Sequence, residues 1–203
     1  MKKGLLISVL LLSATSYADD TGFYLGAGVG GFFTSSGDYY SGAATGISGQ
    51  AYVGYNFMRY FGTELDVNSG AAINWISIAA STIGSSIGYT SLSGVSVTDY
   101  GLSVIGYLPV FPTSNFKLFT KLGLSLNTQQ LSVSQTFPGN NQTQNFNVYG
   151  TNIGFLYGLG MQYDLWNKVI LRLAYQNNGN SNPGDGYGSF SPNFVNLSLG
   201  YKF

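Results

Sequence analysis

The 203-residue sequence contains no cysteine and no histidine, and only 8% of its residues are charged. The absence of cysteine excludes disulfides, thiol chemistry and cysteine-ligated metals. The absence of histidine excludes imidazole as a catalytic base or a metal ligand. An ordinary soluble domain carries about 25% charged residues, so this chain has too little charge for an ordinary water-exposed surface. Its net charge of zero offers no basic footprint for nucleic acid.

The sequence also lacks any apolar run long enough to form a membrane-spanning helix. Residues Met1–Ala18 read MKKGLLISVLLLSATSYA, in which two lysines precede the short apolar run Leu5–Leu12. Small residues at Ser16 and Ala18 complete the pattern of a secretory signal peptide. We therefore expect residues 1–18 to be an export signal and residues 19–203 to form one exported domain.

Most of the remaining sequence alternates apolar residues with small or polar ones, a period typical of strands that have two different faces. The pattern predicts eight strands, at about residues 22–31, 47–57, 61–68, 97–108, 116–126, 150–165 and 169–176, with the last ending at Phe203. Three connections are short, and four are long and polar, at about residues 32–46, 68–96, 127–149 and 177–193. This predicts an all-β, eight-stranded antiparallel up-and-down transmembrane barrel with short periplasmic turns and long extracellular loops. The even strand number places both termini on the periplasmic side.

The position of the charges distinguishes a membrane barrel from a soluble one, which would point its apolar face inward. Eight charged residues of the predicted strands share the face opposite the apolar residues: Glu64, Asp66, Asp99, Lys117, Lys121, Asp164, Arg172 and Lys202. Lipid requires an apolar exterior, and a charge there costs about 2–4 kcal/mol at the bilayer midplane. We therefore predict an integral protein of the outer membrane, in contact with lipid and lipopolysaccharide.

Three stretches resemble the small outer-membrane barrel family that includes the OmpA transmembrane domain: GFYLGAGVGG at 22–31, AYVGYNFMRYFGTELDV at 51–67 and LFTKLGLSL at 118–126. The final stretch NFVNLSLGYKF resembles the C-terminal signal that the outer-membrane assembly machinery recognises. The resemblance implies this role for Leu199, Tyr201 and Phe203. The best-known members carry a peptidoglycan-binding domain after the barrel, whereas this sequence stops at Phe203, so we do not expect cell-wall anchoring.

Four of the inward charges, Glu64, Asp66, Lys121 and Arg172, are predicted to lie deepest in the barrel lumen. They fit either a structural ion-pair cluster or a gate in a narrow ion path. Buried charges must be paired to be tolerated, and an eight-stranded barrel encloses just enough space for side chains. The structural interpretation is therefore favoured.

The run Gly26–Gly31 matches the G-x-G-x-x-G pattern of dinucleotide sites, but no helix is predicted after it. The known enzymes among outer-membrane barrels share a need for a catalytic histidine, and this sequence contains none. We therefore predict no enzyme activity, no cofactor and no metal site.

The predicted long loops are rich in serine, glycine, asparagine, threonine and tyrosine, the adaptable contact chemistry of binding loops. We expect a structural envelope protein whose extracellular loops contact a host or other surface ligand. The alternative is a narrow channel, or a conduit for small solutes or hydrophobic compounds similar to OmpW-like proteins. The apolar patch at residues 71–87 suggests this alternative.

Overall fold

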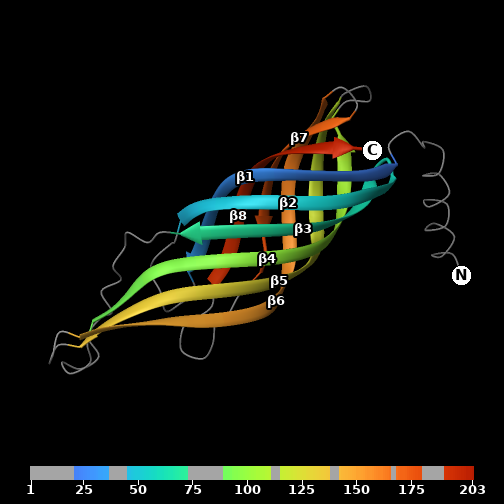
Figure 1. Ribbon diagram of the computed structural model, residues 1–203. Coiled ribbons are helices and arrows are strands. Elements are labelled where there is room, and N and C mark those ends of the chain that lie inside the picture. Colours follow the sequence, from blue (N-terminus) through green and yellow to red (C-terminus); the bar gives the residue numbers. More distant parts are fainter. Residues whose placement is uncertain are drawn as a thin grey trace, which may run out of the picture.

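The computed structural model describes residues 21–36, 45–72, 89–110, 115–137, 142–165, 168–179 and 190–203. They form β1 (Gly22–Ser36), β2 (Thr45–Met58), β3 (Phe61–Ala72), β4 (Tyr89–Pro109), β5 (Phe116–Phe137), β6 (Gln142–Leu165), β7 (Val169–Asn177) and β8 (Phe190–Lys202). Each strand pairs with its chain neighbours in antiparallel order, and β8 pairs with β1 to close a barrel (Figure 1). The predicted eight-stranded antiparallel barrel is confirmed.

Several of the sequence predictions fall largely outside these ranges. The predicted export signal, residues 1–18, lies outside the described residues, as does most of the apolar patch at 71–87. Most residues of the predicted long loops at 32–46, 68–96 and 177–193 also lie outside them. Among the residues that are described, no helix has the length and apolar character needed to cross a membrane.

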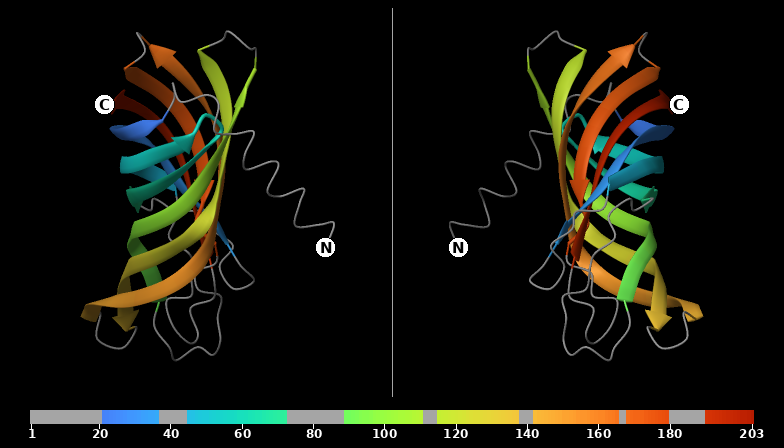
Figure 2. Two further views of the ribbon diagram at one scale, coloured as in Figure 1. Left: turned by 90° about the vertical axis from the view of Figure 1, so that its right-hand side faces the viewer. Right: turned by 90° about the vertical axis from the view of Figure 1, so that its left-hand side faces the viewer.

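The barrel has two unlike ends. At the short-turn end, brief connections join β2 to β3, β4 to β5 and β6 to β7, and the C-terminus lies beside them (Figure 2). At the opposite end, called here the long-strand end, β4, β5 and β6 extend over 21, 22 and 24 residues. In Figure 1 these three strands run out together beyond the ends of β2 and β3.

The prediction of a long loop at residues 127–149 is wrong for most of that range. β5 continues to Phe137, β6 begins at Gln142, and the β5–β6 ladder runs without a register shift from Phe137↔Gln142 to Phe116↔Tyr163. The prediction failed because Asn, Gln, Thr and Ser dominate this stretch, a composition typical of loops. Its few apolar residues nevertheless share one phase, since Leu131 and Val133 on β5 are the register partners of Val148 and Phe146 on β6. β4 likewise begins at Tyr89 rather than near residue 97, and its ladder with β5 shifts register between Leu92 and Gly94.

An apolar band surrounds the outside of the barrel. It is formed by the apolar residues of the alternating pattern, which point outward as predicted. One row of register partners runs across seven strands and exposes only apolar side chains: Tyr201, Leu25, Val53, Leu65, Leu102, Leu124 and Phe155. Leu102 and Leu124 are about as exposed as surface residues of a soluble protein, at 58% and 60%. Such a surface is stable only where lipid replaces water.

A row of hydroxyl side chains bounds this band towards the long-strand end. Ser69, Thr98, Thr128 and Thr151 are register partners on β3, β4, β5 and β6, and the hydroxyls of Ser69 and Thr98 lie 3.3 Å apart. The adjacent row towards the short turns is apolar again, with Tyr100 and Leu126 among its members. Residues 89–98 of β4, 128–137 of β5 and 142–151 of β6 therefore lie at or beyond the band, and they are called here the projecting sheet.

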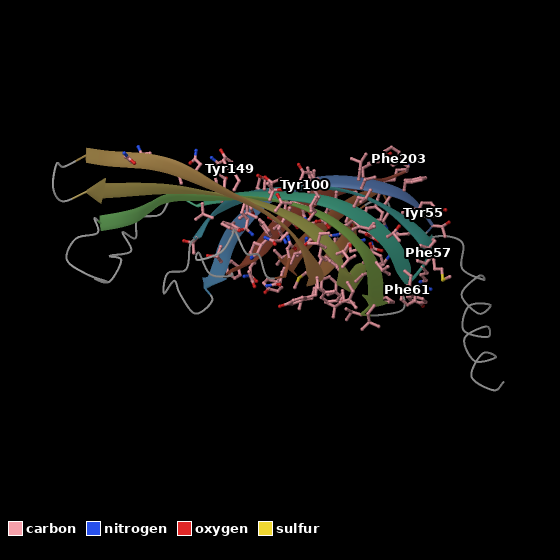
Figure 3. All side chains as sticks on the ribbon, turned by 90° about the horizontal axis from the view of Figure 1, so that it is seen from below. Tyr55, Phe57, Phe61, Tyr100, Tyr149 and Phe203 are labelled. Carbon is pink, nitrogen blue, oxygen red and sulfur yellow. The ribbon has the colours of Figure 1, made fainter. Side chains whose placement is uncertain are left out.

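Aromatic side chains gather at the short-turn end of the band. Tyr55, Phe57, Phe61 and Phe203 lie there, whereas Tyr149 lies out towards the projecting sheet and Tyr100 between them (Figure 3). The Phe23 and Tyr55 rings contact each other at a centroid distance of 4.7 Å. Aromatic rings of this kind occupy the boundary between hydrocarbon and headgroups.

Candidate functional site

The centre of the lumen holds four charged side chains from three alternate strands. Glu64 and Asp66 come from β3, Lys121 from β5 and Arg172 from β7. The Arg172 guanidinium lies 2.6 Å from Glu64 Oε2, and Lys121 Nζ lies 3.1 Å from Asp66 Oδ2 and also contacts Glu64 Oε1. Their side chains are at most 2% exposed. The structure therefore brings together all four residues that the sequence placed deepest, as one network with no net charge.

Neutral side chains add further hydrogen bonds to this network. Tyr24 donates to Glu64 Oε2 at 2.9 Å, and Arg172 donates to Gln162 Oε1 at 2.9 Å. Gln176 donates to Asp66 Oδ1 at 3.0 Å and accepts from Lys121 at 3.3 Å. The charge pattern alone did not reveal these partners, although Gln162 and Gln176 stand in the inward phase of their strands.

Aromatic rings enclose the Arg172 guanidinium within the lumen. Its central carbon lies 4.6 Å from the Tyr52 ring centroid, 4.8 Å from that of Phe119 and 5.4 Å from that of Tyr24. A planar, weakly hydrated guanidinium suits stacking of this kind better than a lysine ammonium does. The rings also fill the space around the ion pairs, which leaves little room for water.

Glycines on neighbouring strands make room for these large side chains. Tyr24 lies against Gly54 so closely that a Cβ at position 54 would overlap its ring. A Cβ at Gly101 would come within 2.9 Å of Asp66 Oδ1. The glycines that stand opposite large inward residues are therefore part of the network's packing.

A second group of charges lies nearer the short-turn end. Asp164 pairs with Lys117 at 3.1 Å and with Lys202 at 2.7 Å. Gln162 connects the two groups, because it accepts from Arg172 and donates to Asp164 Oδ1 at 2.7 Å.

The lumen is closed by side chains on both sides of the central network. Towards the short turns, Ile105, Tyr107, Phe119 and Ala174 form a buried apolar cluster. Towards the long-strand end, Phe32, Val95, Val97 and Phe194 form another, called here the apolar cap. An arrangement of this kind holds alternate strands together across the lumen, with buried apolar side chains on either side of the ion pairs.

The three residues expected to form the assembly signal lie on the outside of β8. Leu199, Tyr201 and Phe203 are 58%, 40% and 72% exposed. Leu199 and Tyr201 are the register partners of Ala27 and Leu25 on β1, so this segment also forms the seam that closes the barrel.

The long-strand end presents a strand edge. Within the described part of the chain, residues 142–153 of β6 pair with β5 alone, because the β6–β7 ladder begins only at Tyr157. The backbone of Asn178 and Gly179 lies against Gly154 and Phe155 and covers the edge at that level. The sequence from Leu122 to Tyr163 contains no charged residue and only one proline, at position 138.

Comparison with known proteins places the chain among outer-membrane barrels. The model of the outer membrane protein beta-barrel domain family matches residues 4–203. The crystal structure of Neisserial surface protein A is 20% identical, with a TM-score of 0.60, covering 90% of this chain and 97% of that one. A major outer membrane protein from Thermus thermophilus is 16% identical, with a TM-score of 0.59, covering 91% of this chain and all of that one.

The attachment invasion locus protein Ail of Yersinia pestis is more distant. It is 13% identical, with a TM-score of 0.52, over 90% of this chain and 99% of that one. No curated protein sequence matches this chain. At these identities the solved structures establish the shared barrel fold.

Proposed function

The chain belongs to the outer membrane protein beta-barrel domain family, and from this premise we propose that it is a surface-interaction protein whose projecting sheet binds an extended, uncharged segment of a partner protein. The family and the fold make it an integral outer-membrane barrel. The observation that carries the finer proposal is the edge of β6 at residues 142–151, which pairs with β5 alone among the residues that the structure describes. The proposed contact surface is therefore a sheet edge, within the stretch for which the sequence predicted a loop.

An unpaired strand edge presents a row of backbone donors and acceptors that another strand can complete. Natural proteins block such edges with lysine, proline or bulges. Residues 142–153 carry none of the first two, and their ladder with β5 has no bulge. Residues 142–151 of this edge lie at or beyond the hydroxyl row, outside the apolar band, whereas Ile153 pairs with Leu126 within the band.

The charge distribution supports a neutral partner. All eight lysine and arginine residues lie in the N-terminal segment, at the short-turn end or in the lumen: Lys2, Lys3, Arg59, Lys117, Lys121, Lys168, Arg172 and Lys202. The structure of Ail includes a complex with the heparin analogue sucrose octasulfate, a polyanion. With no basic residue at its long-strand end, this chain is poorly suited to such a ligand.

We also propose that the short turns and both termini face the periplasm, after removal of residues 1–18 as an export signal. The apolar band then lies in lipid, with lipopolysaccharide around the base of the projecting sheet. The assembly machinery would recognise Leu199, Tyr201 and Phe203, which are exposed on the strand that closes the barrel.

Binding by the β6 edge is tested with two lysines introduced on it, Asn145→Lys and Asn147→Lys, both at exposed positions. Bacteria displaying the wild-type chain or this variant at equal surface levels are incubated with immobilised serum and extracellular-matrix proteins. We expect the variant to lose most of the binding, because lysine on a strand edge opposes addition of a further strand.

The matched control is Thr128→Lys on β5, whose backbone pairs on both sides with β4 and β6. It adds the same type of charge to the same sheet and should leave binding unchanged. Equal binding by the edge variant and the wild type, or equal loss in both variants, would exclude the β6 edge as the binding surface.

The channel alternative receives little support from the lumen. The central network and the apolar clusters on either side of it fill the barrel, and their side chains are almost fully buried. We therefore expect no steady conductance from the folded barrel in planar lipid bilayers.

A further inference from the structure

We propose that Asp99, Asn127, Gln129 and Asn178 bind one monovalent metal cation, represented by Na⁺, in the lumen beneath the apolar cap. Asp99 on β4 differs from the other lumen acids. Glu64, Asp66 and Asp164 each pair with lysine or arginine, whereas no lysine or arginine of the described residues forms an ion pair with Asp99. Its exposure is 0%, so a bare carboxylate there would be very costly.

The neighbours of Asp99 supply oxygen atoms that lack donors. Asp99 and Asn127 are register partners on β4 and β5, and Gln129 faces inward two positions beyond Asn127. Asn178 follows β7 and donates its amide to Asp99 Oδ2. The side-chain oxygens Asp99 Oδ1, Asn127 Oδ1, Gln129 Oε1 and Asn178 Oδ1 are all buried and have no hydrogen-bond partner.

The hydrogen bonds of the amide groups identify the unpaired atoms as oxygens. Asn127 Nδ2 donates to the Asn178 carbonyl at 2.8 Å and to Ser125 Oγ at 3.2 Å. Asn178 Nδ2 donates to Asp99. Both amide nitrogens are therefore in use, and the side-chain oxygen of each residue remains as an acceptor without a donor. Gln129 differs, because its amide nitrogen also lacks a partner and only its Oε1 could serve the ion. The unpaired oxygens of Asp99, Asn127 and Asn178 are acceptors without a donor, and a cation satisfies such a set.

The donor set also indicates the type of cation. Carboxylate and amide oxygens suit hard cations and offer nothing to soft metals. One carboxylate balances one positive charge, whereas a divalent ion would leave an uncompensated charge in the lumen. The apolar cap lies directly above, with Val97 the register partner of Gln129, and it separates the site from water at the long-strand end. The cation would be bound as the barrel closes.

The test begins by folding the purified chain into detergent micelles in NaCl or in choline chloride of the same ionic strength. Unfolding is then followed by the mobility difference between folded and heated protein on gels. We expect a higher unfolding temperature in NaCl than in choline chloride. Above the dissociation constant, each tenfold increase in Na⁺ concentration should raise the unfolding temperature by about the same amount. Elemental analysis after dialysis against choline chloride should find about one sodium per folded chain, the stoichiometry of a single site.

Three variants locate the site. Asp99→Asn should fold equally well in both salts and retain no sodium, and Gln129→Leu should shift the dependence to higher Na⁺ concentration. Asp164→Asn, which removes a lumen carboxylate near the short turns, should keep the full Na⁺ dependence. If the wild type shows no difference between the two salts and holds no sodium, the site holds water or a proton and the proposal fails. The same Na⁺ dependence in Asp99→Asn would also overturn it.

Discussion

The central barrel and the projecting sheet are continuous strands of one structure, yet they are stabilised in opposite ways. In the barrel, each strand has two neighbours, the outside is apolar, and the lumen holds charges that pair across it. The projecting sheet contains no charged residue, its inward phase holds the apolar Val95 and Val97, and the edge strand β6 has one neighbour among the described residues. Lipid requires closure and strict alternation, whereas water permits an open edge.

The strongest way to test this comparison is to break the central ion-pair network. Glu64→Ala leaves Arg172 buried without its carboxylate partner, and we expect a loss of about 3–5 kcal/mol in the free energy of unfolding. Urea unfolding of the barrel in lipid vesicles measures it. The double change Glu64→Leu with Arg172→Leu should cost much less, because Lys121 keeps Asp66 and no unpaired charge remains. A double variant as unstable as the single one would show that the pair itself stabilises the barrel.

A matched pair of arginine substitutions compares the two regions directly. Leu124→Arg places a charge on the apolar band, 60% exposed on the lipid side, and should cost about 2–4 kcal/mol. Asn145→Arg places the same charge on the projecting sheet, where water solvates it, and should change stability by about 0.5 kcal/mol or less. Both are measured by the same urea titration. Similar costs at the two positions would mean that the hydroxyl row does not mark the lipid boundary.

The smallest effect on stability is expected at the C-terminus. Phe203→Ala removes a side chain that is 72% exposed, so folding into detergent micelles should change by about 0.5 kcal/mol or less. The amount of assembled barrel in cells should nevertheless fall several-fold if the residue belongs to an assembly signal. Leu197→Ala, an outward residue of the same strand that is 53% exposed, is the control and should assemble normally. Normal assembly of Phe203→Ala would remove Phe203 from the proposed signal.

The sequence predicted the barrel more completely than the projecting sheet for a physical reason. Lipid on one side and a packed lumen on the other impose a period of two on residues such as Leu122, Leu124 and Leu126, and this period is visible without a structure. Beyond the hydroxyl row the apolar residues change phase, because Val95 and Val97 face inward and Leu131 stands in the inward phase of β5. The outward apolar period that marks a lipid-facing strand therefore ends there. The hairpin of β5 and β6 was therefore interpreted as a loop.

The candidate site, like the fold, could be predicted from the sequence only in part. The inward phase of Glu64, Asp66, Lys121 and Arg172 could be derived strand by strand, but their contacts depend on how far each strand is shifted against the next. The isolation of Asp99 depends on the same shift, together with the turn after β7 that brings Asn178 into the lumen.

The scarcity of charge in the sequence was enough to determine the surrounding solvent. With 8% charged residues and no basic residue on the apolar face, the chain could only be stable with lipid around it. The alternation along each strand contains this information because the polarity of each residue depends on whether it faces lipid or the lumen. Only the tertiary structure decided which charges meet, which carboxylate has no basic partner and which strand keeps an open edge, because these depend on barrel closure and strand length.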